Sequence, residues 1–73
     1  MVGYVGVLTV ASRGSAGPGE VELRIRGGTE RFLARSDEPL PIGRRVLVIE
    51  AHRHRTVTVV PWDDDGLDPI NNT

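Results

Sequence analysis

Three serines and two histidines are the side chains that could support nucleophilic catalysis. The serines are Ser12, Ser15 and Ser36, and the two histidines, His52 and His54, lie in a predicted turn. A catalytic serine needs a base within hydrogen-bond reach and a third group that orients the base. No serine here lies in a G-x-S-x-G motif, and a 73-residue chain that fills its core with its own side chains has little room for a substrate pocket. The sequence therefore predicts a protein that is not an enzyme.

Two clusters have the composition of a metal site but not its pattern. On a strand, His52 and His54 would face the same way, yet the chain has no third histidine and no cysteine, and arginines flank the pair. The acidic run from Asp63 to Asp68 lacks the flanking helices and the glutamate at the twelfth loop position that an EF-hand requires. We therefore expect no bound metal and no other cofactor, and interpret these clusters as an exposed turn and a solvated tail.

Charge is distributed unevenly along the chain, although the formal net charge is only −1. All nine basic residues are arginines between Arg13 and Arg55, so the part up to Pro61 carries +3, whereas residues 62–73 hold four aspartates and no base. A basic body with an acidic tail indicates an anionic partner or a tail that folds back on the body. The absence of lysine is also typical of codon usage in a GC-rich genome, in which case the arginines carry no functional meaning.

The elements that must position these residues are strands, because apolar and polar residues alternate with a period of two. The clearest pair covers residues 21–26 and 29–35, which Gly27 and Gly28 join into a β-hairpin. The same pattern predicts strands over 2–11, 45–51 and 56–60, loops over 12–19 and 37–43, and a disordered acidic tail over 62–73. Five short strands without a helix predict an all-β domain over residues 1–61, a small barrel or compact roll. Closure into a barrel would remove exposed strand edges.

The alternation also predicts which side chains fill the barrel and which point outward. The inward set is one phase of each strand: Val5, Val7, Val21, Leu23, Ile25, Phe32, Ala34, Ile42, Val46, Val48, Val57 and Val59. Leu33, Leu47 and Ile49 fall out of phase with this set. Together with Trp62, which follows Pro61, they predict an apolar interface for a protein partner or a second copy of the chain. The competing interpretation is that they cap the barrel ends or cover a bulge.

Nucleic-acid binding is the alternative function. Some small five-stranded barrels, those of the OB type, bind single strands through a basic groove and aromatic side chains on which bases stack. The arginines available for such a face lie on the central hairpin and at the turn near residue 54: Arg24, Arg26, Arg31, Arg35, Arg53 and Arg55. However, the chain has only one Phe, one Tyr and one Trp, and Glu22 and Glu30 interrupt the basic face. Cross-strand Glu–Arg pairs are an ordinary way to stabilise a sheet, so this function ranks second.

The order of several short motifs resembles a known family. The motifs are Gly3-x-x-Gly6-Val7, Pro18-Gly19-Glu20-Val21, Phe32-x-Ala34-x-Ser36, Ile42-Gly43-x-x-Val46-x-Val48 and Val57-x-Val59-x-Pro61. Over residues 3–61 this arrangement resembles the C-terminal soluble domain of the NfeD family. The resemblance implies a five-stranded OB barrel without the helix that many OB folds carry. It also implies a protein partner of the stomatin, prohibitin and flotillin-like (SPFH) class, which organises membrane microdomains.

The resemblance does not carry over every property of the family. Its members are typically anchored in the membrane, and longer ones include a serine protease domain. The longest apolar run here, residues 46–49, is far shorter than the roughly 20 residues of a membrane-spanning helix, and no signal peptide is visible. We therefore expect a cytoplasmic domain, peripheral to the membrane through a partner or a segment missing from this chain. Self-association is a further expectation, because so small a domain has a thin stability margin.

Overall fold

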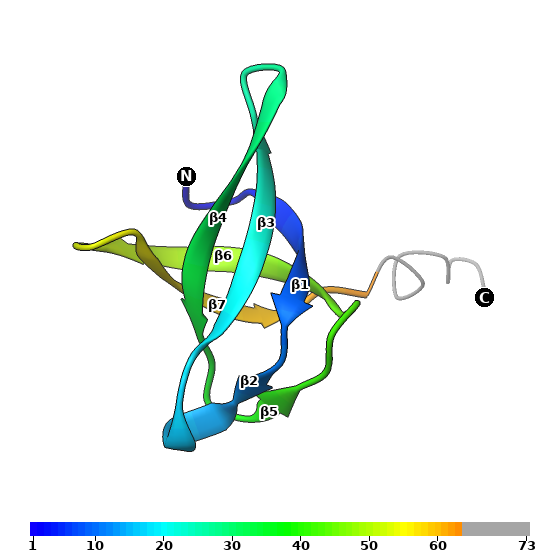
Figure 1. Cartoon of the computed structure of the whole chain (residues 1–73), viewed down its shortest axis with the longest axis vertical. Coiled ribbons are helices and arrows are strands. Elements are labelled where there is room, and N and C mark those ends of the chain that lie inside the picture. The colour runs from blue at the N-terminus through cyan, green and yellow to red at the C-terminus, as the bar shows by residue number, and fades with distance from the viewer. Residues whose placement is uncertain (64–73) are drawn as a thin grey trace, which may run out of the picture.

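The computed structural model describes residues 1–63 and shows an all-β molecule (Figure 1). Its strands are β1 (Val5–Val10), β2 (Ser12–Arg13), β3 (Gly19–Ile25), β4 (Gly28–Arg35), β5 (Pro39–Leu40), β6 (Arg45–His52) and β7 (Thr56–Pro61). One turn of 3-10 helix, η1 (Gly14–Ala16), is the only helical segment of the described residues. Five strands form a closed barrel in the order β1-β3-β4-β7-β6, which confirms the predicted five-stranded barrel without an α-helix.

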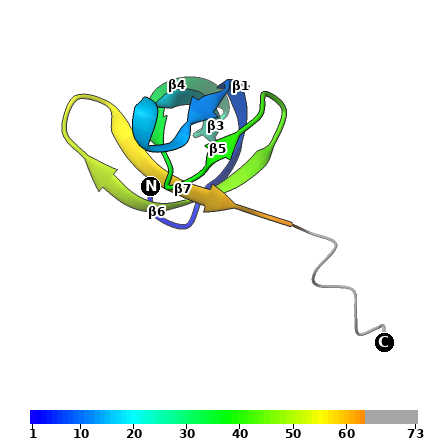
Figure 2. The same ribbon diagram turned by 90° about the horizontal axis from the view of Figure 1, so that it is seen from below.

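Two hairpins and one parallel contact build the barrel. The β3–β4 hairpin pairs from Gly19 and Ala34 to Ile25 and Gly28, and its tip extends beyond the barrel wall (Figure 1). The antiparallel β6–β7 hairpin crosses it, and the strands curve around a common centre in Figure 2. A short parallel contact between β4 and β7, centred on the Ala34–Val57 pair, closes the barrel. Closure thus depends on strands that are far apart in the sequence.

The turn of the β3–β4 hairpin lies one residue earlier than the sequence indicates. Ile25 pairs with Gly28, so the two turn residues are Arg26 and Gly27, with φ angles of 52° and 84°. Two consecutive positive φ values are typical of the type I′ turn, whose twist matches that of the flanking strands. Arg26 therefore belongs to the tip of the hairpin and not to a strand.

The core lies inside the barrel and consists of ten buried apolar residues. Eight of them were predicted: Val21, Leu23, Phe32, Ala34, Val46, Val48, Val57 and Val59. Ile25 is partly buried and packs against this cluster. The prediction omitted Leu8 and Leu40, which are also buried. The strand pattern therefore located most of the core correctly.

The inward phase of β1 is the main error in the predicted core. Val5 is only half-buried and Val7 is 42% exposed, whereas Gly6 and Leu8 face inward. The reason is that β1 passes very close to β3: a Cβ atom on Gly6 would lie 2.5 Å from the Leu23 side chain and 2.6 Å from the Glu22 carbonyl oxygen. Only glycine fits there, so the two valines point outward. Ile42, also predicted as core, is 67% exposed in the turn before β6.

A two-stranded sheet of β2 and β5 covers one end of the barrel, in a segment that was predicted as loop. Two buried hydroxyls hold it in place. Ser12 Oγ and Ser36 Oγ lie 2.6 Å apart, Ser36 Oγ donates to the Glu38 carbonyl oxygen, and Ser12 Oγ accepts from the Gly14 amide. Both hydroxyls thus have partners, as buried polar groups require.

Candidate protein-interaction surface

The outer face of the barrel carries a row of apolar side chains across three strands. Val5 on β1 pairs with Leu47 on β6, and Leu47 pairs with Val60 on β7. All three are half-buried, so their side chains are only partly covered by neighbours. We call Val5, Leu47 and Val60 the apolar row. Because paired residues on one face of a sheet are in contact, the apolar row is a continuous strip.

Trp62 continues this face beyond the end of β7. Its backbone amide donates to the Arg45 carbonyl oxygen at 2.9 Å, which extends the β6–β7 pairing by one residue. Side chains alternate along a strand, so Trp62 shares the outer face with Val60. Trp62 and Asp63, which the sequence assigned to the tail, are therefore attached to the barrel; residues 64–73 lie outside the described residues.

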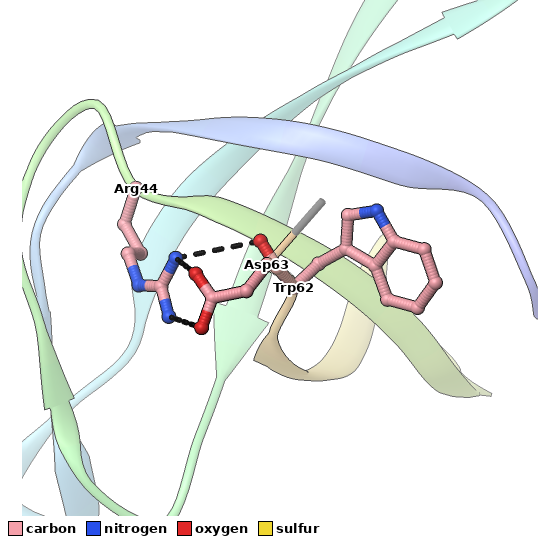
Figure 3. Close-up of polar contacts among 3 residues, drawn as sticks. All are labelled: Arg44, Trp62 and Asp63. Atoms are coloured by element: carbon pink, nitrogen blue, oxygen red, sulfur yellow. Dashed lines mark hydrogen bonds and ion pairs between the residues drawn. The ribbon is translucent and has the colours of Figure 1, made fainter. Parts of the chain in front are cut away.

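Arg44 clamps the chain at this point (Figure 3). Its guanidinium donates to both carboxylate oxygens of Asp63, at 2.9 and 3.4 Å, and to the Trp62 carbonyl oxygen at 3.4 Å. The indole extends away from the guanidinium, on the other side of the backbone. Bidentate pairs of this kind restrict orientation as well as distance. The clamp thus limits where the indole can lie.

The four residues predicted as an interface do not form one cluster. Leu47 and Trp62 lie in neighbouring rows, because Trp62 bonds to Arg45, two residues before Leu47. Ile49 is 42% exposed at the bulge of β6. Leu33 pairs with Thr56, at the opposite end of β7 from Val60. Neither Val5 nor Val60 was predicted from the sequence as an interface residue. Val5 was assigned to the core and Val60 to neither face.

The predicted arginines separate into two groups. Arg24, Arg31 and Arg35 lie exposed on the outer face of the β3–β4 hairpin, the arginine face. Arg26 and Arg53 lie in the two hairpin turns. Among the described residues, none of these five side chains has a hydrogen bond or ion pair. Glu20 and Glu22 lie on the same outer face, opposite Leu33 and Arg31, so positive and negative charges are interspersed there.

Arg55, by contrast, is part of the fold. Its guanidinium lies 4.6 Å from the centre of the Phe32 ring, forms an ion pair with Glu30 at 3.3 Å and donates to the Arg31 carbonyl oxygen at 2.8 Å. Its own carbonyl oxygen accepts from the Leu33 amide. Phe32, covered in this way, is buried and cannot stack on a base.

His52, Ser12 and Ser36 form hydrogen bonds with other groups, whereas Ser15 and His54 are exposed. His52 Nε2 lies 2.7 Å from Thr58 Oγ1 and 3.4 Å from Glu50 Oε1, while no hydrogen bond joins a serine to a histidine in the described residues. In the same range no three His, Cys, Asp or Glu side chains are grouped as metal ligands would be. No helix within residues 1–63 is long and apolar enough to cross a membrane.

Comparison with known proteins identifies what the barrel resembles. Residues 5–60 match the NfeD C-terminal domain. The soluble domain of the NfeD protein YuaF from Bacillus subtilis has 30% identity and a TM-score of 0.68, over 81% of this chain and 70% of that chain. The C-terminal domain of stomatin operon partner protein 1510-C from Pyrococcus horikoshii has 24% identity and a TM-score of 0.66, over 88% of this chain and 91% of that chain. No curated protein matches.

Proposed function

Because the chain belongs to the NfeD C-terminal domain family, we propose that it is a non-enzymatic module that binds an SPFH-type protein. The observation that carries the proposal is the apolar row on the outer face of β1, β6 and β7. Apolar side chains that remain partly exposed in a contiguous strip are typical of protein-binding surfaces. The name of the Pyrococcus protein, a stomatin operon partner, supports the choice of partner.

The interior of the barrel supports a binding role over a catalytic one. Seven large core side chains are less than 2% exposed, so the inside is filled and recognition has to occur on the outer surface. Trp62 strengthens the apolar row as a binding site, because tryptophan is enriched among residues that dominate binding energy. In this proposal the domain is cytoplasmic and reaches the membrane through its SPFH-type partner.

The test is the affinity of the chain for a purified SPFH-type protein from the same genome, measured by biolayer interferometry. We expect Leu47→Asp and Trp62→Ala each to weaken binding by roughly tenfold or more, as loss of a central interface residue does. Leu33→Asp is the matched control, since Leu33 has a similar apolar side chain far from the apolar row. It should change affinity less than about twofold.

A variant that unfolds would imitate loss of binding, so circular dichroism and a thermal melt accompany each measurement. Trp62→Ala lies after the last strand and tests the surface even if Leu47→Asp disturbs the sheet. Equal weakening by the Leu33 and Leu47 variants would contradict the proposed surface. Absence of binding by the unmodified chain would contradict the proposed function.

A further inference from the structure

A groove opens on the outer surface where β1 separates from β3. The two strands pair from Val7 and Glu22 onward, but nearer the start of the chain β1 turns toward β6 and β3 continues into the projecting hairpin. The space between them is lined by Val5, Gly6, Val7, Glu22, Arg24, Thr29 and Arg45. We call this space the groove. It adjoins the apolar row, because Val5 belongs to both.

The groove combines apolar and charged side chains in a specific order. Val7 is 42% exposed, and its two partners in register are both charged: Arg45 on β6 and Glu22 on β3. Arg24 lies two residues beyond Glu22 on the same face of β3, opposite Thr29 of β4. Its guanidinium has no ion pair or hydrogen bond among residues 1–63. An apolar position thus lies near an arginine that forms no ion pair or hydrogen bond with the described residues.

At Val7 a partner has to bind through side chains. There the backbone of β1 is paired with β3 on one edge and with β6 on the other. A partner strand therefore cannot add to β1 at Val7 by backbone hydrogen bonds, which is how many extended peptides bind to sheet edges. Arg24 presents a guanidinium, a group that binds a carboxylate in a planar, two-point geometry.

We propose that the groove binds a protein segment that places an apolar side chain on Val5 and Val7 and a carboxylate on Arg24. This inference rests on the proposed protein-binding function and specifies its partner: the bound segment carries Asp or Glu next to an apolar residue. The apolar contact supplies affinity and the carboxylate supplies selectivity, since charged pairs mainly determine which partner is accepted. Segments with Lys or Arg in that position are repelled by Arg24.

The experiment is a selection of random twelve-residue peptides, displayed on phage, against the immobilised 73-residue chain. Arg24→Glu is the matched test variant and Arg53→Glu the control, because both exposed arginines lack partners in the described part and both changes alter the charge equally. We expect the unmodified chain to enrich peptides in which Asp or Glu lies within two positions of an apolar residue. These peptides should bind Arg24→Glu at least tenfold more weakly and Arg53→Glu within about twofold.

Val7→Ser, compared with Ile42→Ser in an exposed position outside the groove, tests the apolar contact in the same assay. Only the Val7 change should weaken binding. No enrichment, enrichment of basic peptides, or equal binding to the two arginine variants would overturn the inference. The selection does not use the SPFH-type protein, so its result and the SPFH affinity test the two proposals separately. If the SPFH-type protein binds the Arg24→Glu variant as tightly as the unmodified chain, this inference alone is overturned. If acidic peptides bind but the SPFH-type protein does not, only the proposed partner is overturned.

Discussion

Arg55 illustrates how a residue with an apparent binding role can be structural. Its guanidinium lies over Phe32, pairs with Glu30 and bonds to the Arg31 carbonyl oxygen, beside the short stretch over which β4 and β7 pair. It therefore covers the edge of β4 next to the parallel contact. Among the arginines of the predicted nucleic-acid face, Arg55 is the one whose side chain forms an ion pair and a hydrogen bond with other described residues.

Replacing Arg55 by alanine should lower the free energy of unfolding by about 1 kcal/mol. An exposed cation–π contact and a solvent-screened ion pair each contribute less than that, and the bond to the carbonyl oxygen adds to them. Urea denaturation followed by circular dichroism measures the change. Arg53→Ala is the control in the same turn and should stay within about 0.5 kcal/mol of the unmodified chain. Equal effects of the two changes would argue against a structural role for Arg55.

The Arg44 clamp makes a prediction that needs no partner. Trp62 is the only tryptophan, so intrinsic fluorescence reports its surroundings directly. Arg44→Ala and Asp63→Asn both break the bidentate pair and should shift the emission to longer wavelength, because the half-buried indole gains contact with water. Raising the salt concentration should move the unmodified chain in the same direction. An emission spectrum unchanged in both variants would show that the clamp does not position the indole.

At the scale of elements, the close approach of β1 to β3 depends on Gly6. Gly6→Ala would bring a Cβ atom within 2.6 Å of the Glu22 carbonyl oxygen, so a backbone must shift. We expect a loss of about 2–3 kcal/mol in unfolding free energy, the upper part of the range for overpacking. Gly28→Ala is the control, because the nearest atom there would be 3.9 Å away. Similar chemical denaturation midpoints for the two variants would contradict this account of β1.

The β2–β5 sheet depends on the Ser12–Ser36 hydrogen bond in a testable way. Ser36→Ala removes the 2.6 Å contact and leaves the Ser12 hydroxyl with fewer partners in a buried place. Leaving a buried polar group unsatisfied costs about 1–3 kcal/mol. In a double-mutant cycle, the Ser12→Ala/Ser36→Ala variant should therefore be less destabilised than the sum of the single changes. Additive effects, measured by thermal unfolding, would mean that the hydroxyls act independently.

At the scale of the whole molecule, the distribution of aromatic residues argues against single-stranded nucleic-acid binding. Phe32 is buried beneath Arg55, while Tyr4 precedes β1 and Trp62 follows β7, so no aromatic side chain lies on the arginine face. Base stacking on aromatic residues supplies much of the affinity of OB barrels for single strands. The arginine face also contains Glu20 and Glu22.

We therefore expect no saturable binding of a mixed twelve-nucleotide DNA strand at low salt. Proton–nitrogen NMR spectra of the labelled chain, recorded up to millimolar DNA, measure this residue by residue. Shifts that cluster at Arg24 and Arg31 and disappear as salt is raised would instead indicate phosphate binding. That outcome would place nucleic-acid binding ahead of the peptide-binding groove as the role of Arg24.

The sequence by itself determined the features that depend on neighbouring residues. The alternation from Val21 to Arg35 and from Val46 to Val59 predicted the first hairpin, the two strands of the second and eight core residues, because the period of a strand is a local property. The order of the short motifs was enough to indicate the family. The predicted C-terminal ends of the five barrel strands lie within one residue of the observed C-terminal ends.

Only the tertiary structure decided the features that depend on contacts between distant segments. The approach of Gly6 to β3 determined which side chains of β1 face the core. The parallel pairing of β4 with β7 placed Leu33 away from Leu47. The contact of Arg55 with Phe32 gave this arginine a structural role. Each involves residues more than ten positions apart. A period of two cannot specify which of two phases faces the core when both contain apolar residues, so packing between strands made that choice.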